Sequence, residues 1–588
     1  MKAYFSLTAL GLLIAAFCGA ALSWDGAAYL FHVLDEQRPF TPNHRLINIP
    51  LQWPVLLSSH FTSDLAVLRT IFGLSYITVP LVALALSWWI VRHQARSLFV
   101  WAALGVGFAT LPGQFLLVSE ANIAIQLFWP ILLAILTGMR LVTVPVVLLL
   151  TVAVGLSHPD AIALFGFAAV LAFAVGLRRR AARGWLWLWA LYFAVVTGII
   201  LVRFLRLRTA YEGDQVSLEM LRWTFSVAVA GLPLLAMMGS FLVATAIFAA
   251  PWVAKIQNRT LLLAIYASEL VAGIGIAVLL LVWASIPRLW MFANKFTFAA
   301  LFTSLFPMGL AALESLLNPA SDPERADSEL RWLHRRRTAQ VTAGIFALVL
   351  CAQSATWLYL TRQLEQTVTA SPWSCLSMAP IWWLANSPLG QFATPYYVLL
   401  LQGQQPQKLL LGEDRCATAT FAEGLSLDTY SLRHWGGGWF DLSLLQRNLS
   451  NEETTMPGCW FVLSSGWHRT EASSPQNWWR WSDGRAAQIQ VSLDRDEQVM
   501  IGGRMQSLQQ PNTVDLLVNG KRAAAVAITW QGLASFEPLA LPLKQGKNMI
   551  ELVSHNPPLQ DGNRQLAIGV SRLTLTASKT GQPCLLRQ

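Results

Sequence analysis

The run LAVLRTIFGLSYITVPLVALALSWWIV, residues 65–91, contains a single charged side chain, that of Arg69. A helix that crosses a bilayer needs about 17–25 mostly apolar residues, and this run is long enough to provide one. The composition agrees, because 55% of the 588 residues are hydrophobic and 13% are charged, whereas soluble domains carry about 25% charged residues. The sequence therefore predicts an integral membrane protein.

Outward from this run, further apolar runs extend over residues 1–360. Together they predict an α-helical, polytopic membrane domain of about eleven spans. The first run resembles a signal peptide, but we expect a retained helix because many spans follow it and its cleavage pattern is loose. The predicted spans are residues 4–23, 65–91, 98–118, 123–138, 141–156, 161–177, 185–202, 223–252, 261–285, 296–317 and 341–360.

Lys and Arg cluster in alternate connections between these spans, and the positive-inside rule assigns such connections to the cytoplasm. We therefore predict a multi-pass protein of the inner (plasma) membrane with a cytoplasmic N-terminus. An odd number of spans then places the chain after residue 360 in the periplasm. The basic residues of the cytoplasmic connections are Arg92, Arg96, Arg140, Arg178, Lys255, Arg259, Arg331 and Arg335–Arg337.

After residue 360 the long apolar runs end. Residues 361–485 are rich in Trp and Gly and predict a soluble, mixed α/β segment. Residues 486–588 contain short alternating segments such as AQIQVSL, with turn signals such as VNGK. This pattern predicts an antiparallel β-sandwich of jelly-roll or carbohydrate-module type.

The soluble part holds four cysteines, which allow three pairings. We favour Cys375 with Cys416, because both precede the β-rich end of the chain, and four free thiols are the alternative. Cys18 and Cys351 lie in apolar runs and are expected to be buried as small apolar side chains. The remaining two cysteines are Cys459 and Cys584.

Carboxylates gather at the outer ends of the predicted spans, where ionisable residues are costly and therefore functional candidates. Asp25 follows the first span directly, and Glu120 closes the third span on the same face. As a pair they can bind a divalent metal such as Mg or Mn, or one of them can act as a general base toward an acceptor hydroxyl. The alternative is that each marks a helix end in interfacial water. Asp35 and Glu36, at the end of an amphipathic surface helix, are candidate substrate-binding residues.

Basic residues on the outer face are candidate substrate ligands. Arg203, Arg206 and Arg208 fall in a predicted outer loop and so break the positive-inside pattern. Guanidinium groups there can hold a phosphate or pyrophosphate, although snorkelling toward lipid headgroups is the alternative. His158 and Asp160, at the outer end of the fifth span, are candidate substrate contacts or simply a helix start.

The formal net charge of +10 does not indicate a nucleic-acid partner. The basic residues stand in short clusters between apolar runs, and no Walker-type, Rossmann-type or zinc-finger spacing occurs. Membrane lipids are the expected surroundings. Arg45 and Arg69, in or after the first outer loop, are weaker candidates for phosphate binding.

Three short motifs and the architecture carry a family resemblance. WDGAAYLFHVLDE (24–36) follows the first span, SEANIAIQ (119–126) lies in a later outer loop, and SHPDA (157–161) contains a histidine turn. In this arrangement the chain resembles the membrane-embedded glycosyltransferases of the GT-C fold class. The segment 466–491, followed by DLLVNGK (515–521), resembles a β-sandwich found behind such membrane domains.

The resemblance implies roles for particular residues. Asp25 would be the catalytic carboxylate, Glu120 a second acidic residue of the metal or donor site, and the outer arginines ligands of a lipid phosphate. The donor would be a sugar on a polyprenyl phosphate, and the acceptor a glycan, lipid or protein outside the membrane. Some members carry an acidic neighbour beside the second acidic residue, and Glu120 has none.

Two other function classes remain open from the sequence. A transporter or flippase for a glycolipid or polysaccharide would place ionisable residues near the middle of its spans. Only Glu269 and Glu314 come near that condition, whereas the other carboxylates gather at the outer face, which favours the enzyme. The third class is a non-catalytic assembly protein of an envelope polysaccharide system.

Overall fold

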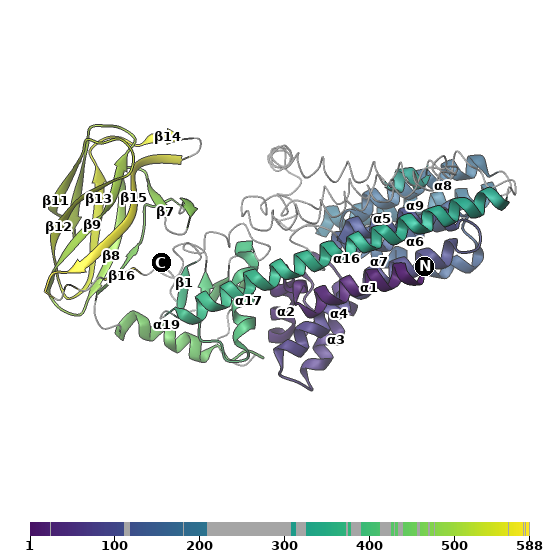
Figure 1. The fold of residues 1–588 in the computed structure, drawn as a ribbon, viewed down its shortest axis with the longest axis horizontal. Coiled ribbons are helices and arrows are strands. Elements are labelled where there is room, and N and C mark those ends of the chain that lie inside the picture. Colours follow the sequence, from purple (N-terminus) through teal and green to yellow (C-terminus); the bar gives the residue numbers. More distant parts are fainter. Residues whose placement is uncertain are drawn as a thin grey trace, which may run out of the picture. The chain divides into compact units, whose positions relative to one another are not determined.

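The chain forms two compact units, Met1–Gln363 with Asn386–Ala393, and Leu364–Ala385 with Thr394–Gln588. Each unit is described by itself. The computed structural model (Figure 1) describes residues 1–23, 25–110, 118–179, 182–207, 307–312, 325–371, 374–377, 390–411, 425–427, 430–432, 439–455, 459–468, 471–474, 477–561, 564–579, 581 and 584–586.

Helices make up the described part of the first unit. Four of them are long and apolar enough to cross a membrane, namely α4, α8, α9 and the part of α16 from Arg335 onward. These helices indicate a membrane protein, as predicted. The helices are α1 (Lys2–Phe17), α2 (Asp25–Glu36), α3 (Asn48–Ser59), α4 (Leu65–Val91), α5 (Phe99–Thr110), α6 (Glu120–Leu136), α7 (Val144–Gly155), α8 (Ala161–Arg178), α9 (Arg183–Leu207) and α16 (Arg325–Ala370), with 3₁₀ turns η1 (Ala20–Leu22), η2 (Pro42–His44), η3 (Arg96–Leu98) and η4 (Leu141–Thr143).

The helix bounds differ from most of the predicted spans, and they differ most in α1, α9 and α16, the last of which covers Arg325–Ala370 where residues 341–360 were predicted. The first helix ends at Phe17, because Gly19 takes a left-handed φ of 75° and the turn η1 follows. The seventh predicted span continues to Leu207, so Arg203 and Arg206 lie in the last turns of α9 and not in a loop. The predicted spans 223–252 and 261–285, and most of 296–317, fall outside the described residues, and the count of eleven spans stays a prediction.

Small residues let α1 approach its neighbours closely. A Cβ built on Gly11 of α1 would lie 2.8 Å from Ala347 Cα of α16. A Cβ on Gly73 of α4 would lie 3.1 Å from Ala16 Cα of α1. In a bilayer, helices associate through such close packing and not through a hydrophobic force, so these contacts hold α1 between α4 and α16.

The second unit ends in two six-stranded sheets, ordered β11-β10-β13-β8-β5-β16 and β12-β9-β15-β7-β6, with β14 paired to β15. All described pairs in them are antiparallel except β16 with β5. Their strands are β5 (Cys459–Leu463), β6 (Glu471–Ser474), β7 (Asn477–Asp483), β8 (Ala486–Leu493), β9 (Glu497–Ser507), β10 (Asn512–Val518), β11 (Lys521–Ile528), β12 (Ala534–Leu543), β13 (Gly546–Ser554), β14 (Leu559–Asp561), β15 (Arg564–Ala577) and β16 (Leu585–Leu586). Before them come α17 (Gly390–Gln402), α19 (Ser443–Thr455) and the short pairs β1 (Cys375–Ser377) with β2 (Leu409–Leu411) and β3 (Leu425–Leu427) with β4 (Tyr430–Leu432).

Buried and exposed side chains alternate along these segments, which explains why they form strands. In β8, Ile489 and Val491 point into one hydrophobic core, which β9 joins through Val499 and Ile501. Asn519 and Gly520 both have positive φ, the geometry that a two-residue turn between β10 and β11 requires. The predicted antiparallel strands are therefore confirmed, and they begin at β5, earlier in the chain than residue 486.

The three described cysteines of the second unit are disulfide-bonded. Cys459 is bonded to Cys584, 125 residues away. Cys375 is also disulfide-bonded, and its predicted partner Cys416 lies outside the described residues. Cys18 and Cys351 are free.

Replacing Cys459 and Cys584 with serine is expected to destabilise the sheets by up to about 5 kcal/mol, because the bond restricts a long loop of the unfolded chain. Hydrogen exchange of the strands at increasing denaturant measures the change. Cys18→Ser is the control, since that thiol is free and belongs to the other unit. An unchanged exchange midpoint in the double variant would contradict the prediction.

Candidate functional site

Glu120 is a buried carboxylate whose two oxygens are both in use. Its side chain is 2% exposed. Tyr29 Oη and Asn48 Nδ2 donate to its Oε1 at 2.6 and 2.7 Å, and Arg45 Nη1 donates to its Oε2 at 2.9 Å. A buried charge is tolerated only when it is paired and hydrogen-bonded, so these three donors compensate Glu120 and fix its position.

Glu120 begins a helix, which corrects the prediction that it closes the preceding span. It is the first residue of α6, and Ser119 before it is the N-cap. A serine side chain accepts from the free backbone N–H groups of a first turn, and a carboxylate there lies at the positive end of the helix. The local sequence thus places Glu120 where α6 starts.

Helix α3 buries the polar side chains of Asn48 and Gln52 and exposes the apolar side chains of Trp53 and Leu57. Asn48 accepts from Tyr76 Oη of α4 at 3.0 Å, and the buried Gln52 accepts from Phe40 N at 2.7 Å. No Asp, Glu, Lys or Arg occurs in residues 46–63. Exposed apolar side chains on an uncharged segment suit a helix that rests against lipid. Trp53 and Leu57 of α3 are 53 and 56% exposed, and Leu46 and Phe61, just before and after the helix, are 37 and 83% exposed.

Asp25 begins α2 beside the same network. A Cβ on Gly26 would overlap Ala21 O and would lie 3.4 Å from Val118 Cγ2, so the segment before Glu120 packs against the start of α2. The partly buried Asp25 carboxyl has no hydrogen-bond partner among the described residues. Burial and the charge of Glu120 raise the pKa of Asp25 to about 7, and Arg45 opposes this rise.

A pocket adjoins this network, and its lining includes Arg45, His158 and Arg203. Arg203 of α9 donates to His44 O at 2.9 Å and more weakly to Gly155 O at 3.4 Å. The Nε atom of Arg45 is buried without a partner among the described groups. Arg45 therefore belongs both to the pocket and to the network around Glu120. We name this the cationic pocket.

Asp160 lies beside the cationic pocket. Its carboxylate is 3.3 Å from His158 Nδ1. Burial raises the pKa of Asp160, but His158 and then Arg45 outweigh that effect and hold it below its usual range. The predicted candidates His158 and Asp160 thus stand together, next to Arg45.

Other predicted residues lie elsewhere. Glu36 is at the far end of α2 from Asp25, about 16 Å along the axis, and pairs with His32 and Arg38. Asp35 precedes it on the same helix. Arg206 is exposed on α9 and does not line the cationic pocket. Arg208 lies outside the described residues.

The sequence reasoning missed Tyr29 and Asn48 and undervalued Arg45. Tyr29 follows Asp25 by four residues, which places both on one helix face. Asn48 and Gln52 have the same spacing in a segment without Asp, Glu, Lys or Arg. A polar pair at helical spacing in such a segment is a signal that could have found them.

The surroundings of Glu120 do not favour a metal ion. Its oxygens already accept three hydrogen bonds, one of them from the guanidinium of Arg45, and a divalent cation would be repelled there. Within the part of the chain that the structure describes, no cluster of three or more His, Cys, Asp or Glu fits a metal. Mg or Mn binding by Asp25 and Glu120 stays a prediction, and no step below uses it.

The arrangement brings together a carboxyl that titrates near neutral pH and a pocket lined with cations. Asp25 can therefore accept a proton, while Arg45 and Arg203 can hold an anion. No family model matches the chain, and no curated protein matches its sequence.

Arg45→Leu is expected to destabilise the helical unit by about 3–5 kcal/mol, because it leaves the charge of Glu120 buried and unpaired. The double variant Arg45→Leu/Glu120→Leu should regain much of this loss, since no charge then remains in the interior. Thermal unfolding in lipid nanodiscs measures both.

Arg38→Leu is the matched control for this experiment. Arg38 pairs with Glu36 but its side chain is 75% exposed, so its removal should cost less than about 1 kcal/mol. Strictly additive effects of the Arg45 and Glu120 changes would show that the two residues are not coupled.

Proposed function

We propose that this protein is a GT-C-like membrane glycosyltransferase. It transfers a sugar from a polyprenyl-phosphate donor to a glycan, lipid or protein acceptor outside the membrane. The observation that carries the proposal is the proximity of Asp25, with a pKa raised to about 7, to Arg45 of the cationic pocket. A general base is most effective when its pKa is near the working pH.

Asp25 is the base in this proposal. The acceptor hydroxyl attacks the anomeric carbon of the sugar and gives its proton to the Asp25 carboxylate, while the bond from that carbon to the phosphate oxygen breaks. Glu120 does not serve as the base, because Tyr29, Asn48 and Arg45 already occupy its oxygens. Its charge instead keeps the pKa of Asp25 raised.

The cationic pocket holds the phosphate of the donor. The unpartnered Nε of Arg45 supports this, because a phosphate oxygen would supply the acceptor that it lacks. Arg203 offers a second guanidinium, and His158 a third polar contact. As the sugar leaves, the lipid phosphate gains negative charge, and the two guanidinium groups stabilise that charge more than they stabilise the bound donor.

The second unit supports an outward orientation. Disulfides such as Cys459–Cys584 persist outside the cytoplasm, in agreement with a cytoplasmic N-terminus and a periplasmic C-terminal unit. We assign its two sheets, which share one hydrophobic core, to a β-sandwich of carbohydrate-module type that handles the acceptor.

Asp25→Asn is expected to lower kcat by about 10²–10⁴-fold, the usual contribution of a general base. The raised pKa means that the wild-type carboxyl is protonated below about pH 7, so wild-type activity should fall as the pH drops through that value. The residual activity of Asp25→Asn should lack this acid limb. A defined polyprenyl-phosphate sugar and a glycan acceptor in nanodiscs serve for the assay.

Asp64→Asn is the control, because Asp64 is exposed and caps α4 through a bond that asparagine keeps. Full activity of Asp25→Asn, or an acid limb that persists in it, would show that Asp25 is not the base.

Arg203→Ala is expected to raise KM for the lipid donor roughly tenfold or more, the result of losing a charged phosphate contact. Arg206→Ala is the matched control, since Arg206 lies one turn away on α9, exposed and outside the pocket lining. Equal effects of the two variants would mean that the arginines only attract lipid headgroups.

A further inference from the structure

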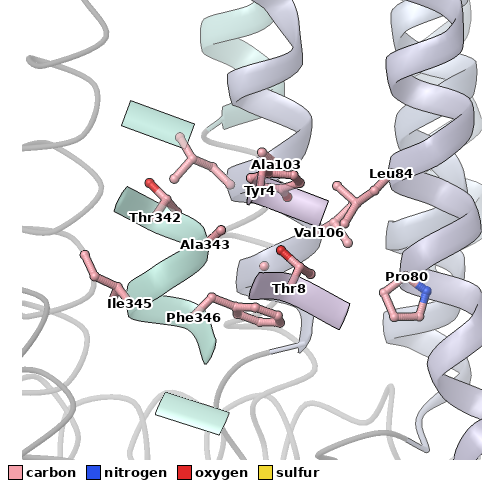
Figure 2. Close-up of a pocket in the computed structure, with 12 residues that line it drawn as sticks. Tyr4, Thr8, Pro80, Leu84, Ala103, Val106, Thr342, Ala343, Ile345 and Phe346 are labelled. Carbon is pink, nitrogen blue, oxygen red and sulfur yellow. The ribbon is translucent and has the colours of Figure 1, made fainter. Parts of the chain in front are cut away.

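Aromatic side chains from four helices meet at the end of the bundle where α1 begins and α4 ends. The ring centroid of Phe99, in α5, lies 5.3 Å from that of Tyr4 in α1 and 5.5 Å from that of Trp88 in α4. Trp88 also stacks on Trp332 of α16, at 5.3 Å and an interplanar angle of 22°. Tyr4 lines a small gap that side chains of the same four helices enclose (Figure 2). The helices are therefore closely packed at this end, which holds the groups around it in place.

Three cations stand beside this aromatic cluster. The guanidinium carbon of Arg96 lies 6.0 Å from the centre of the Trp332 ring, which is a cation–π contact. Arg336 follows Trp332 by four residues, so it lies one turn further along the same face of α16. Burial and then the charge of Arg336 lower the pKa of the Met1 amino group, so this amine and the guanidinium lie close together. We name the Met1 amine, Arg96 and Arg336 the basic surface.

The basic surface carries positive charge that the described structure does not compensate. Both arginines are exposed, and neither pairs with a carboxylate or donates to an acceptor among the described groups. The described carboxylates of the helical unit belong to α2, lie near Arg45, or cap the far end of α4. They are Asp25, Asp35, Glu36, Asp64, Glu120 and Asp160. Because like charges repel, an anion that binds all three cations lowers the energy of this surface.

The basic surface lies at the ends of two candidate membrane spans. Helix α4 ends at Val91, and the apolar part of α16 begins at Arg335. Lipid headgroups lie at the level of such ends, where tryptophans such as Trp88 and Trp332 are favoured. A lipid phosphate offers oxygens to guanidinium and ammonium groups, whereas the ammonium of a zwitterionic headgroup would be repelled. The surface therefore selects a headgroup with a net negative charge.

We propose that the basic surface is a binding site for the phosphate of an anionic phospholipid. The phosphate bridges the Met1 amine, Arg96 and Arg336, and so joins α1, the turn η3 and α16. The site goes beyond the transferase proposal, since it uses neither Asp25 nor the cationic pocket. Because a ligand that binds only the folded state stabilises it, the lipid also stabilises the packing of these helices.

Native mass spectrometry of the full-length protein in detergent, titrated with phosphatidylglycerol, measures this binding. Phosphatidylglycerol is expected to bind roughly tenfold or more tightly than phosphatidylcholine, the effect of charged hydrogen bonds to one headgroup only. Excess inorganic phosphate should not displace it. Equal affinity for the two lipids would overturn the proposal, and displacement by inorganic phosphate would show a site for the free anion and not for a lipid.

Matched single variants locate the site. Arg96→Gln and Arg336→Gln should each weaken phosphatidylglycerol binding roughly tenfold and leave phosphatidylcholine binding unchanged. Arg178→Gln is the control, because it removes an exposed arginine from the last turn of α8, outside the basic surface. It should leave the binding of both lipids unchanged. Equal effects of the three variants would mean that surface charge in general attracts the lipid, and would overturn the assignment.

Discussion

The buried pair of Glu120 and Arg45 is the interaction on which the helical unit depends. One carboxylate joins α6 to α2 through Tyr29 and to α3 through Asn48. Neither partner is stable in the interior without the other, because desolvation of a single charge costs several kcal/mol. The pair therefore fixes the segment between α1 and α4 against α6 and determines where Asp25 and the cationic pocket lie.

Much of the fold could be predicted from the sequence, because long apolar runs define helices directly. Helix α4 has the predicted bounds, and α8 ends one residue beyond its prediction. Alternating side chains identified the strands after residue 486 in the same way. The end of α9 was missed because Arg203 stops the apolar run without stopping the helix, which continues to Leu207.

The candidate site was harder to predict. Asp25 and Glu120 were found because a carboxylate beside an apolar run is conspicuous. The partners of Glu120 were not found, because Asn48 and Tyr29 lie 72 and 91 positions from it in the chain. Only tertiary packing brings them together, because the spacing of a neutral polar side chain can mark it as a candidate without identifying its partner. The unpaired Nε of Arg45 is likewise visible only in three dimensions.

Arg45 belongs both to the network around Glu120 and to the lining of the cationic pocket. It therefore links the protonation of Asp25 to the binding of an anion in that pocket. Its charge lowers the pKa of Asp25, and an anion in the cationic pocket offsets part of that charge. Anion binding therefore draws a proton onto Asp25 from solution, and by reciprocity a protonated Asp25 strengthens anion binding. In the proposed transferase, donor affinity and catalytic competence would therefore respond to pH in opposite directions, because the donor would be held best when Asp25 is protonated and cannot act as the base.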